Sequence, residues 1–147
     1  MLVPLPPIPD LCDAVRRLLL QVPAGRVTTF GRLAEALGDV TAARWIAYWL
    51  WNDPLAADLP AHRVVLKAGT LVPQVDRQAE RLQAEGVPVN AGQVDLAGFG
   101  FGEFETDRPL LALQQAQDRL AGQISRSPLA GAPKLIGGVD LSYADDW

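Results

Sequence analysis

The chain has 147 residues, 49% of them hydrophobic, so it can bury a core and is not an intrinsically disordered chain. Thirteen Lys and Arg residues against 17 Asp and Glu residues give a net charge of −4, which argues against a generally polybasic nucleic-acid binder. The excess negative charge lies beyond residue 90, because residues 1–90 carry nine basic and nine acidic side chains. The balanced charge of the first ninety residues is therefore compatible with a locally basic surface.

The cysteine and histidine counts limit the chemistry further. A single cysteine, Cys12, excludes an internal disulfide and fits a reducing compartment. With His62 as the one histidine, no zinc site is expected. The N-terminal sequence lacks the features of a secretory signal, and no apolar run approaches the about 18 residues of a transmembrane helix. We therefore expect a soluble cytoplasmic protein with no membrane partner.

Three helices are predicted in the first half of the chain. Asp10 and Thr29 are good N-caps for the first two, and Gly38 ends the second because glycine adopts positive φ readily. Thr41 opens the third helix. The helices are expected over residues 10–21, 29–37 and 41–51. Two short helices joined by a glycine-containing turn are typical of a helix-turn-helix.

The second half predicts a small β element and then a new unit. Residues 63–66 form a strand, and after a turn over 67–70 residues 71–72 are placed to pair back as a hairpin or wing. A helix is expected over 74–85. The Gly-rich residues 87–107 indicate a domain edge and a linker. A helix over 108–124 and a strand over 134–141 follow, and the chain stops before that strand can acquire its sheet.

Four short motifs occur in an order that points to a family. They are Pro23-Ala24-Gly25-Arg26-Val27-Thr28-Thr29-Phe30-Gly31, Ala42-Ala43-Arg44, Asn52-Asp53-Pro54 and Pro60-Ala61-His62-Arg63-Val64-Val65. In this order and spacing, over about residues 8–90, they resemble the DNA-binding domain of the alkylguanine-DNA alkyltransferases. The resemblance implies a mainly α fold with a small β element, a winged helix-turn-helix and double-stranded DNA as the partner.

Ala61 is the decisive departure from that family. The resemblance places the alkyl-accepting cysteine at this position, and a methyl side chain has no lone pair with which to attack. Cys12 lies in the first predicted helix and is not a substitute. No methyltransferase activity is therefore expected, and the chain is not expected to be an enzyme. It resembles instead the alkyltransferase-like proteins, which implies that it binds alkylated guanine by base flipping and flags it for nucleotide excision repair proteins.

The resemblance also assigns roles to individual residues. Arg44 matches the arginine that fills the space left by the flipped nucleotide, and Phe30 stands where the family has a tyrosine that helps to turn the phosphate. The expected DNA-binding residues are Thr28, Thr29, Phe30, Ala42, Ala43, Arg44 and Trp45. The expected base pocket consists of Asn52, Pro60, Ala61 and His62.

Structural alternatives stay open for several of these residues. Thr28 and Thr29 suit N-capping as well as phosphate binding, and Trp45 suits the core as well as DNA contact, whereas Trp49 is expected in the core. His62 and Glu85 match the family's proton relay. Without a thiol to activate, they are expected to form a hydrogen-bonded scaffold. Arg63 is expected to brace the recognition helix, which is the third predicted helix over residues 41–51. Arg77 either reaches DNA or is a solvated helix charge.

A second resemblance covers the last forty residues. Residues 110–124 and 133–143 resemble the start of endonuclease V, whose fold is ribonuclease-H-like, and Asp140 matches its first metal ligand. One carboxylate does not make a magnesium site, so no cofactor is expected unless a complete nuclease domain is present. The implied domains are an alkyltransferase-like domain over 1–90, a linker over 91–107 and the truncated start of an endonuclease V-like domain over 108–147.

Two alternative functions follow from these observations. In the first alternative, the chain is the N-terminal part of a fused repair enzyme that cleaves DNA at deaminated bases with a metal ion. The aromatic recognition helix and the neutral charge of residues 1–90 also fit a docking module that has lost DNA affinity.

Overall fold

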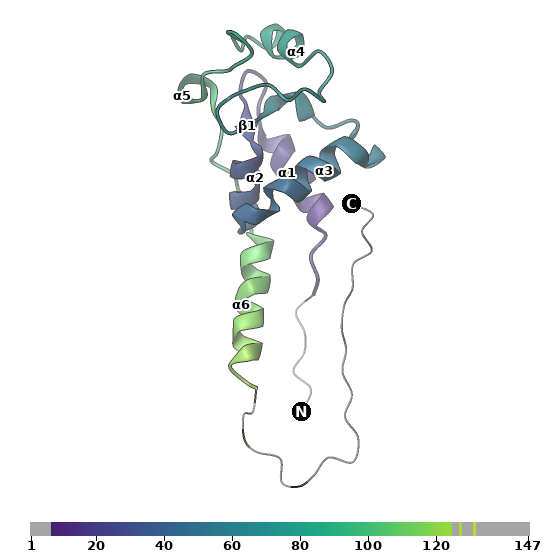
Figure 1. The fold of residues 1–147 in the computed structure, drawn as a ribbon, viewed down its shortest axis with the longest axis vertical. Coiled ribbons are helices and arrows are strands. Elements are labelled where there is room, and N and C mark those ends of the chain that lie inside the picture. The colour runs from purple at the N-terminus through teal and green to yellow at the C-terminus, as the bar shows by residue number, and fades with distance from the viewer. Residues whose placement is uncertain (1–6, 125–126, 128–130, 132–147) are drawn as a thin grey trace.

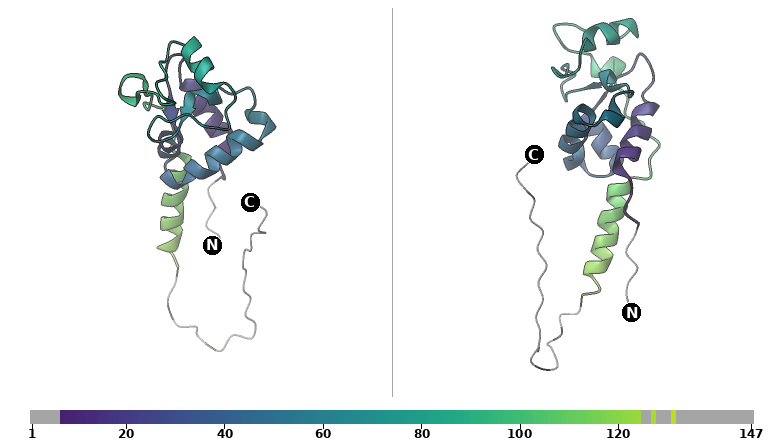
Figure 2. Two further views of the ribbon diagram at one scale, coloured as in Figure 1. Left: turned by 45° about the horizontal axis from the view of Figure 1, so that its top comes forward. Right: turned by 90° about the vertical axis from the view of Figure 1, so that its right-hand side faces the viewer.

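The computed structural model describes residues 7–124, 127 and 131 (Figure 1). In chain order its elements are α1 (Leu11–Gln21), β1 (Thr28–Thr29), α2 (Phe30–Leu37), the 3-10 turn η1 (Val40–Ala42), α3 (Ala43–Asn52), the 3-10 turns η2 (Pro54–Ala56) and η3 (Ala61–Arg63), β2 (Val64–Val65), α4 (Gln78–Ala84), α5 (Leu96–Phe99) and α6 (Pro109–Ala121). The described chain is mainly helical with one small sheet, as predicted. Figures 1 and 2 show α1, α2 and α3 gathered together, with α4 and α5 at one end and α6 projecting from the other.

The helix-turn-helix begins and ends where the capping residues require. The carboxylate of Asp10 accepts a hydrogen bond from the amide of Asp13 (3.0 Å), and Thr29 Oγ1 accepts one from the amide of Arg32 (3.2 Å). Gly38 ends α2 with φ of 102°. These three predictions are confirmed. The third helix differs, because Asp39 caps η1 by accepting from Thr41, and α3 begins only after that turn.

The main core lies where α1, α2 and α3 meet. Apolar side chains recur at helical spacing on each helix, so that each buries one stripe against the other two. Those with no exposed surface in this cluster are Val15, Leu19, Leu33, Ala34, Leu37 and Ile46. The core holds α3 with Ile46, Trp49 and Leu50 inward and leaves its other side to solvent.

The sheet joins two segments that are distant in sequence. β1 and β2 are parallel, with Thr28 opposite Val64 and Thr29 opposite Val65. The predicted hairpin of residues 63–66 with 71–72 is wrong. The amide of Leu71 donates instead to the carbonyl of Gly92 (3.0 Å). This pairing brings the chain after α4 next to the segment that follows β2. A second core cluster is enclosed there, made of Val27, Val65, Leu82, Val87 and Val94.

Residues 91–107 pack on the domain, whereas their composition predicts a linker. The amide of Val27 donates to Phe99 O (2.9 Å), and the amide of Phe101 donates to Val27 O (2.7 Å). Further along, Thr106 Oγ1 donates to the carbonyl of Ala36 at the end of α2 (2.7 Å). Backbone pairing of this kind makes the segment part of the fold, and Gly100 within it lies close to the backbone of Leu96. The domain boundaries themselves remain a prediction.

The C-terminal expectations are met only in part. α6 covers most of the helix predicted over 108–124, and α4 begins later than predicted because Arg77 adopts a left-handed φ of 51°. The strand expected over 134–141, with Asp140 and the ribonuclease-H-like unit, lies outside the described residues. Among the helices that are described, none is both long and apolar enough to cross a bilayer.

Candidate nucleic-acid interface

The solvent side of α3 carries the residue expected to enter the duplex. Arg44 is exposed, and it forms no hydrogen bond or ion pair with any described residue. Tyr48 (47% exposed) and Trp51 (40% exposed) lie on the same side of the helix. Because residues three, four and seven apart share a helix face, these side chains form one ridge with Arg44. The geometry thus leaves Arg44 available to a ligand; its contact with DNA stays a prediction.

Trp45 and Trp49 flank this ridge as a stacked pair. Their ring centroids lie 6.3 Å apart with planes inclined by 15°, and the indole NH of Trp49 donates to Asp53 (2.8 Å). Trp49 is 5% exposed, which confirms its predicted place in the core. Trp45 packs partly against the core and partly lines a shallow depression of about 360 Å³ with Tyr48 and Asn52. Trp45 therefore fits both of its predicted roles.

The residues that open α2 are less accessible than predicted. Thr28 has no exposed surface, and Thr29 is 7% exposed, with its Oγ1 accepting the N-cap hydrogen bond from the amide of Arg32. Capping leaves the hydroxyl proton of Thr29 able to donate, so burial is what limits access to both hydroxyls, and their contact with phosphate stays a prediction. Phe30 is 8% exposed, because the ring of Trp51 covers it edge-on with centroids 5.6 Å apart. Ala42 and Ala43, at the start of α3, are half-buried.

Ala61 and its neighbours begin the turn η3 that leads into β2. Pro60 precedes the turn, Ala61 is half-buried, and His62 is 6% exposed. Asn52 is separate from them in its contacts, because its amide donates to the carbonyl of Tyr48 (2.7 Å) within α3. The structure thus groups Pro60, Ala61 and His62, and it does not bring Asn52 into their hydrogen-bond network.

Glu85 is the centre of that network. Its Oε1 lies 2.8 Å from His62 Nε2, and Arg63 donates to it through Nε (2.9 Å to Oε2) and Nη2 (2.8 Å to Oε1). The amide of Gly25 adds a bond to Oε2 (3.3 Å). The hydrogen bonds from Arg63 are the main reason that the pKa of Glu85 falls to about 2. Glu85 is therefore a carboxylate at neutral pH, and it can only accept.

The charge of Glu85 fixes the state of His62. Since the carboxylate accepts, Nε2 of His62 carries the proton and Nδ1 presents a lone pair. Burial lowers the pKa of His62 despite the opposing effect of Glu85, so the ring is neutral near pH 7. Among the residues that the structure describes, Nδ1 has no hydrogen-bond partner. The predicted hydrogen bond between His62 and Glu85 is confirmed. The acceptor without a partner, Nδ1, belongs to the residue that follows Ala61 in the sequence.

Arg63 braces a different part of the fold from the one predicted. Besides Glu85, it donates through Nη1 to the carbonyl of Val22 at the end of α1 (2.8 Å). It therefore ties α1 to α4, and it does not brace α3. Arg77 lies outside this network and pairs with Glu80 on α4.

Sequence reasoning missed Gln78, the buried amide that holds the turn η3 in place. Gln78 is 3% exposed; its Nε2 donates to His62 O (3.0 Å) and Val64 O (2.7 Å), and its Oε1 accepts from Val72 N (2.6 Å). A glutamine in a polar helix gives no sequence signal for such a role. In the described part of the chain, no three His, Cys, Asp or Glu side chains are grouped to hold a metal ion.

Comparison with known proteins gives one family and several kinds of relative. The profile of the DNA-binding domain of 6-O-methylguanine DNA methyltransferase matches residues 10–87. The DNA base-flipping protein of Escherichia coli is 41% identical over 89 residues, which cover 58% of this chain and 69% of that protein. The bifunctional methyltransferase/endonuclease of Picrophilus torridus is 36% identical over 140 residues, 93% of this chain. This chain spans only 47% of the Picrophilus protein.

The same fold occurs in a solved complex with DNA. The structure of S. pombe Atl1 with damaged DNA containing O6-carboxymethylguanine superposes with a TM-score of 0.54 at 25% sequence identity. The match covers 60% of this chain and 92% of the S. pombe chain.

Proposed function

Because this chain belongs to the family of the 6-O-methylguanine DNA methyltransferase DNA-binding domain, we propose that it binds alkylated guanine in duplex DNA and does not transfer the alkyl group. One observation carries the proposal. The His62–Glu85–Arg63 network is complete, yet the residue next to His62 is Ala61, which has no nucleophilic atom. A scaffold of this kind retains a binding site after the covalent step has been lost.

Docking relies on α3. The ridge of Arg44, Tyr48 and Trp51 faces solvent and enters the minor groove of the duplex. Turning a guanine out of the stack costs a few kcal/mol, and a planar guanidinium such as that of Arg44 fills the gap that is left. The complex of S. pombe Atl1 with damaged DNA, which has the same fold, supports damaged DNA as the partner.

The flipped base lies beside η3. Pro60, Ala61 and His62 form one wall of its pocket, and the methyl group of Ala61 leaves room for an alkyl substituent on the guanine. Asn52 is not part of that wall in this structure, because its amide is held by Tyr48. The bound lesion then serves as a flag for nucleotide excision repair proteins, since the protein itself leaves the damage in place.

A labelling experiment tests the absence of transfer. A duplex that carries a radiolabelled methyl group on guanine is incubated with an excess of the protein, and the protein is then separated under denaturing conditions. We expect no label on the protein, together with a gel shift of the same duplex under native conditions. One equivalent of label on any residue contradicts the proposal.

A second candidate function rests on the relatives. Picrophilus torridus and Nanoarchaeum equitans have proteins named bifunctional methyltransferase/endonuclease and bifunctional methyltransferase-like/endonuclease, and both match more than nine-tenths of this chain. On this alternative the chain is the front of a fused enzyme that cleaves at deaminated bases. Nicking of inosine-containing DNA with magnesium, abolished by Asp140→Ala, establishes it.

A further inference from the structure

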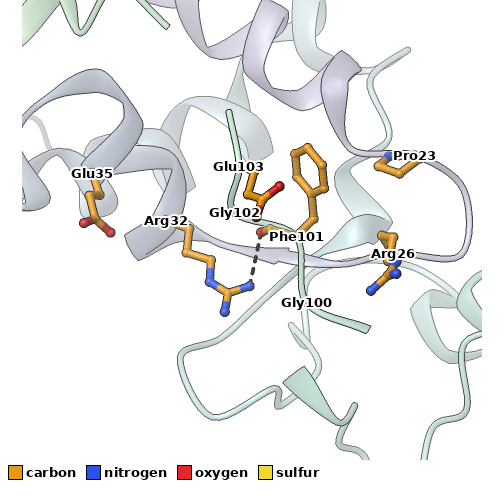
Figure 3. Close-up of a pocket in the computed structure, with 8 residues that line it drawn as sticks. All are labelled: Pro23, Arg26, Arg32, Glu35, Gly100, Phe101, Gly102 and Glu103. Atoms are coloured by element: carbon orange, nitrogen blue, oxygen red, sulfur yellow. Dashed lines mark hydrogen bonds between the residues drawn. The ribbon is translucent and has the colours of Figure 1, made fainter. Parts of the chain in front are cut away.

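A pocket away from Ala61 and Arg44 brings together three separate segments (Figure 3). It lies between the turn after α1, the exposed side of α2 and the glycine-rich segment after α5, and its volume is about 630 Å³. That volume is in the range of small-molecule sites. Its lining residues are Pro23, Arg26, Arg32, Glu35, Gly100, Phe101, Gly102 and Glu103.

Two arginines in the pocket have unused donors. Arg26 Nη1 donates to the carbonyl of Gly98 (3.0 Å), and Arg32 Nη1 donates to the carbonyl of Phe101 (3.2 Å). Neither guanidinium forms an ion pair with any residue that the structure describes. Each guanidinium has five N–H groups in a planar fork, which suits the oxygens of a phosphate group. Figure 3 shows the two side chains approaching the segment 100–102 from either side.

Arg32 lies against the glycines of this segment. A Cβ at Gly100 would stand 2.3 Å from the backbone oxygen of Leu96 and 2.5 Å from Nη1 of Arg32, and one at Gly102 would stand 3.2 Å from Cδ of Arg32. The backbone of α5 therefore requires a glycine at position 100, whereas a side chain at position 102 would need only a small shift of Arg32. The close approach places the guanidinium of Arg32 next to the backbone that lines the pocket.

The remaining lining residues narrow the class of ligand. Glu35 and Glu103 offset the two positive charges, so a bare anion gains little there. A ligand that combines a phosphate with N–H or O–H donors pairs its phosphate with the arginines and its donors with the carboxylates. We propose that this pocket binds a nucleotide, whose phosphate contacts Arg26 and Arg32 and whose base or sugar donors contact the carboxylates. The nucleotide is either free or part of a DNA strand.

Titration of the full chain with small probes tests this site. We expect adenosine monophosphate to produce saturable chemical-shift changes at the amides of Gly100 and Gly102, with inorganic phosphate and adenosine each at least about tenfold weaker. Arg32→Gln is expected to lower the affinity for the nucleotide about tenfold, which corresponds to about 1.4 kcal/mol. Arg119→Gln removes the same charge from the exposed side of α6 and is the matched control.

A competition experiment distinguishes a free nucleotide from a nucleotide of a DNA strand. If a single-stranded oligodeoxynucleotide displaces adenosine monophosphate at comparable phosphate concentration, the site serves a DNA strand; if it does not, the site serves a free nucleotide. Arg26→Gln gives a second variant in case Arg32→Gln unfolds, because Arg26 is exposed. The proposal is overturned if the nucleotide causes no saturable shifts, or if Arg26→Gln and Arg119→Gln bind it equally well.

Discussion

The Nε2 atom of His62 lies 2.8 Å from Oε1 of Glu85, and the same oxygen accepts a hydrogen bond from Nη2 of Arg63. Through these contacts, the carboxylate joins the turn η3 to the end of α4, and Arg63 extends the connection to the end of α1. The network thus has a structural role that does not depend on a nucleophile. This explains how an alanine can stand at position 61 in an otherwise ordered site.

The network makes the stability of the domain sensitive to acid. The pKa of Glu85 is lowered from 4.5 to about 2 in the folded protein, so the stabilisation is complete above pH 4.5 and is lost as pH falls toward 2. The pKa of His62 is also lowered, so the domain loses a further part of its free energy of unfolding as the pH falls below about 6.5, the usual pKa of a histidine. We expect the free energy of unfolding to fall steadily from pH 7 to pH 3.

Chemical denaturation at a series of pH values measures this effect. Glu85→Gln is expected to be less stable than the wild type at pH 7 and to show a smaller loss between pH 4.5 and 3. Glu80→Gln, on the exposed side of the same helix, is the control and is expected to keep the wild-type slope. A Glu85→Gln variant with an unchanged slope contradicts the assignment.

Arg44→Ala is expected to weaken DNA binding without unfolding the domain. Arg44 is exposed and has no described partner, so its removal changes the unfolding free energy by at most about 0.5 kcal/mol. Loss of the group that fills the stack should cost about 1–3 kcal/mol of binding to a lesion-containing duplex. Fluorescence anisotropy and thermal unfolding of Arg44→Ala and Arg119→Ala give both quantities. A variant that melts early but binds normally would show that Arg44 is structural.

Gly38→Ala is expected to destabilise the helix-turn-helix. Gly38 has φ of 102°, and a Cβ there would stand 2.6 Å from the backbone nitrogen of Leu111 at the start of α6. We expect a loss of about 1–3 kcal/mol in the free energy of unfolding. Gly122→Ala is the control, because that residue has right-handed φ and no atom closer than 3.5 Å to the added carbon. Equal stability of the two variants would contradict the tight packing of α6 on the turn.

The local parts of this fold could be predicted from the sequence. Asp10, Thr29 and Gly38 act within a few residues of their own position, so the local sequence alone locates the helix ends that they set. Asp39 was missed because Thr41 offers an equally good cap two residues later. The burial of Trp49 also followed from helical spacing.

The non-local parts could not be predicted. The parallel pairing of Thr28 with Val64 and the bond between Leu71 and Gly92 depend on how distant segments pack. Gly100 indicates a linker by composition, yet glycine is required there because a Cβ would stand 2.3 Å from the backbone oxygen of Leu96. The hydroxyl of Thr28 is a reasonable phosphate ligand in sequence, and only the packing of the sheet shows that it is buried.

Competition binding tests the central claim most directly. A labelled duplex with one O6-methylguanine is bound to the protein and displaced by unlabelled duplexes of the same sequence with and without the lesion. We predict that the modified duplex competes at least about tenfold better, a difference of about 1.4 kcal/mol. Equal competition by the two duplexes, or no binding of either, would contradict recognition of alkylated guanine and would leave a docking module without lesion preference.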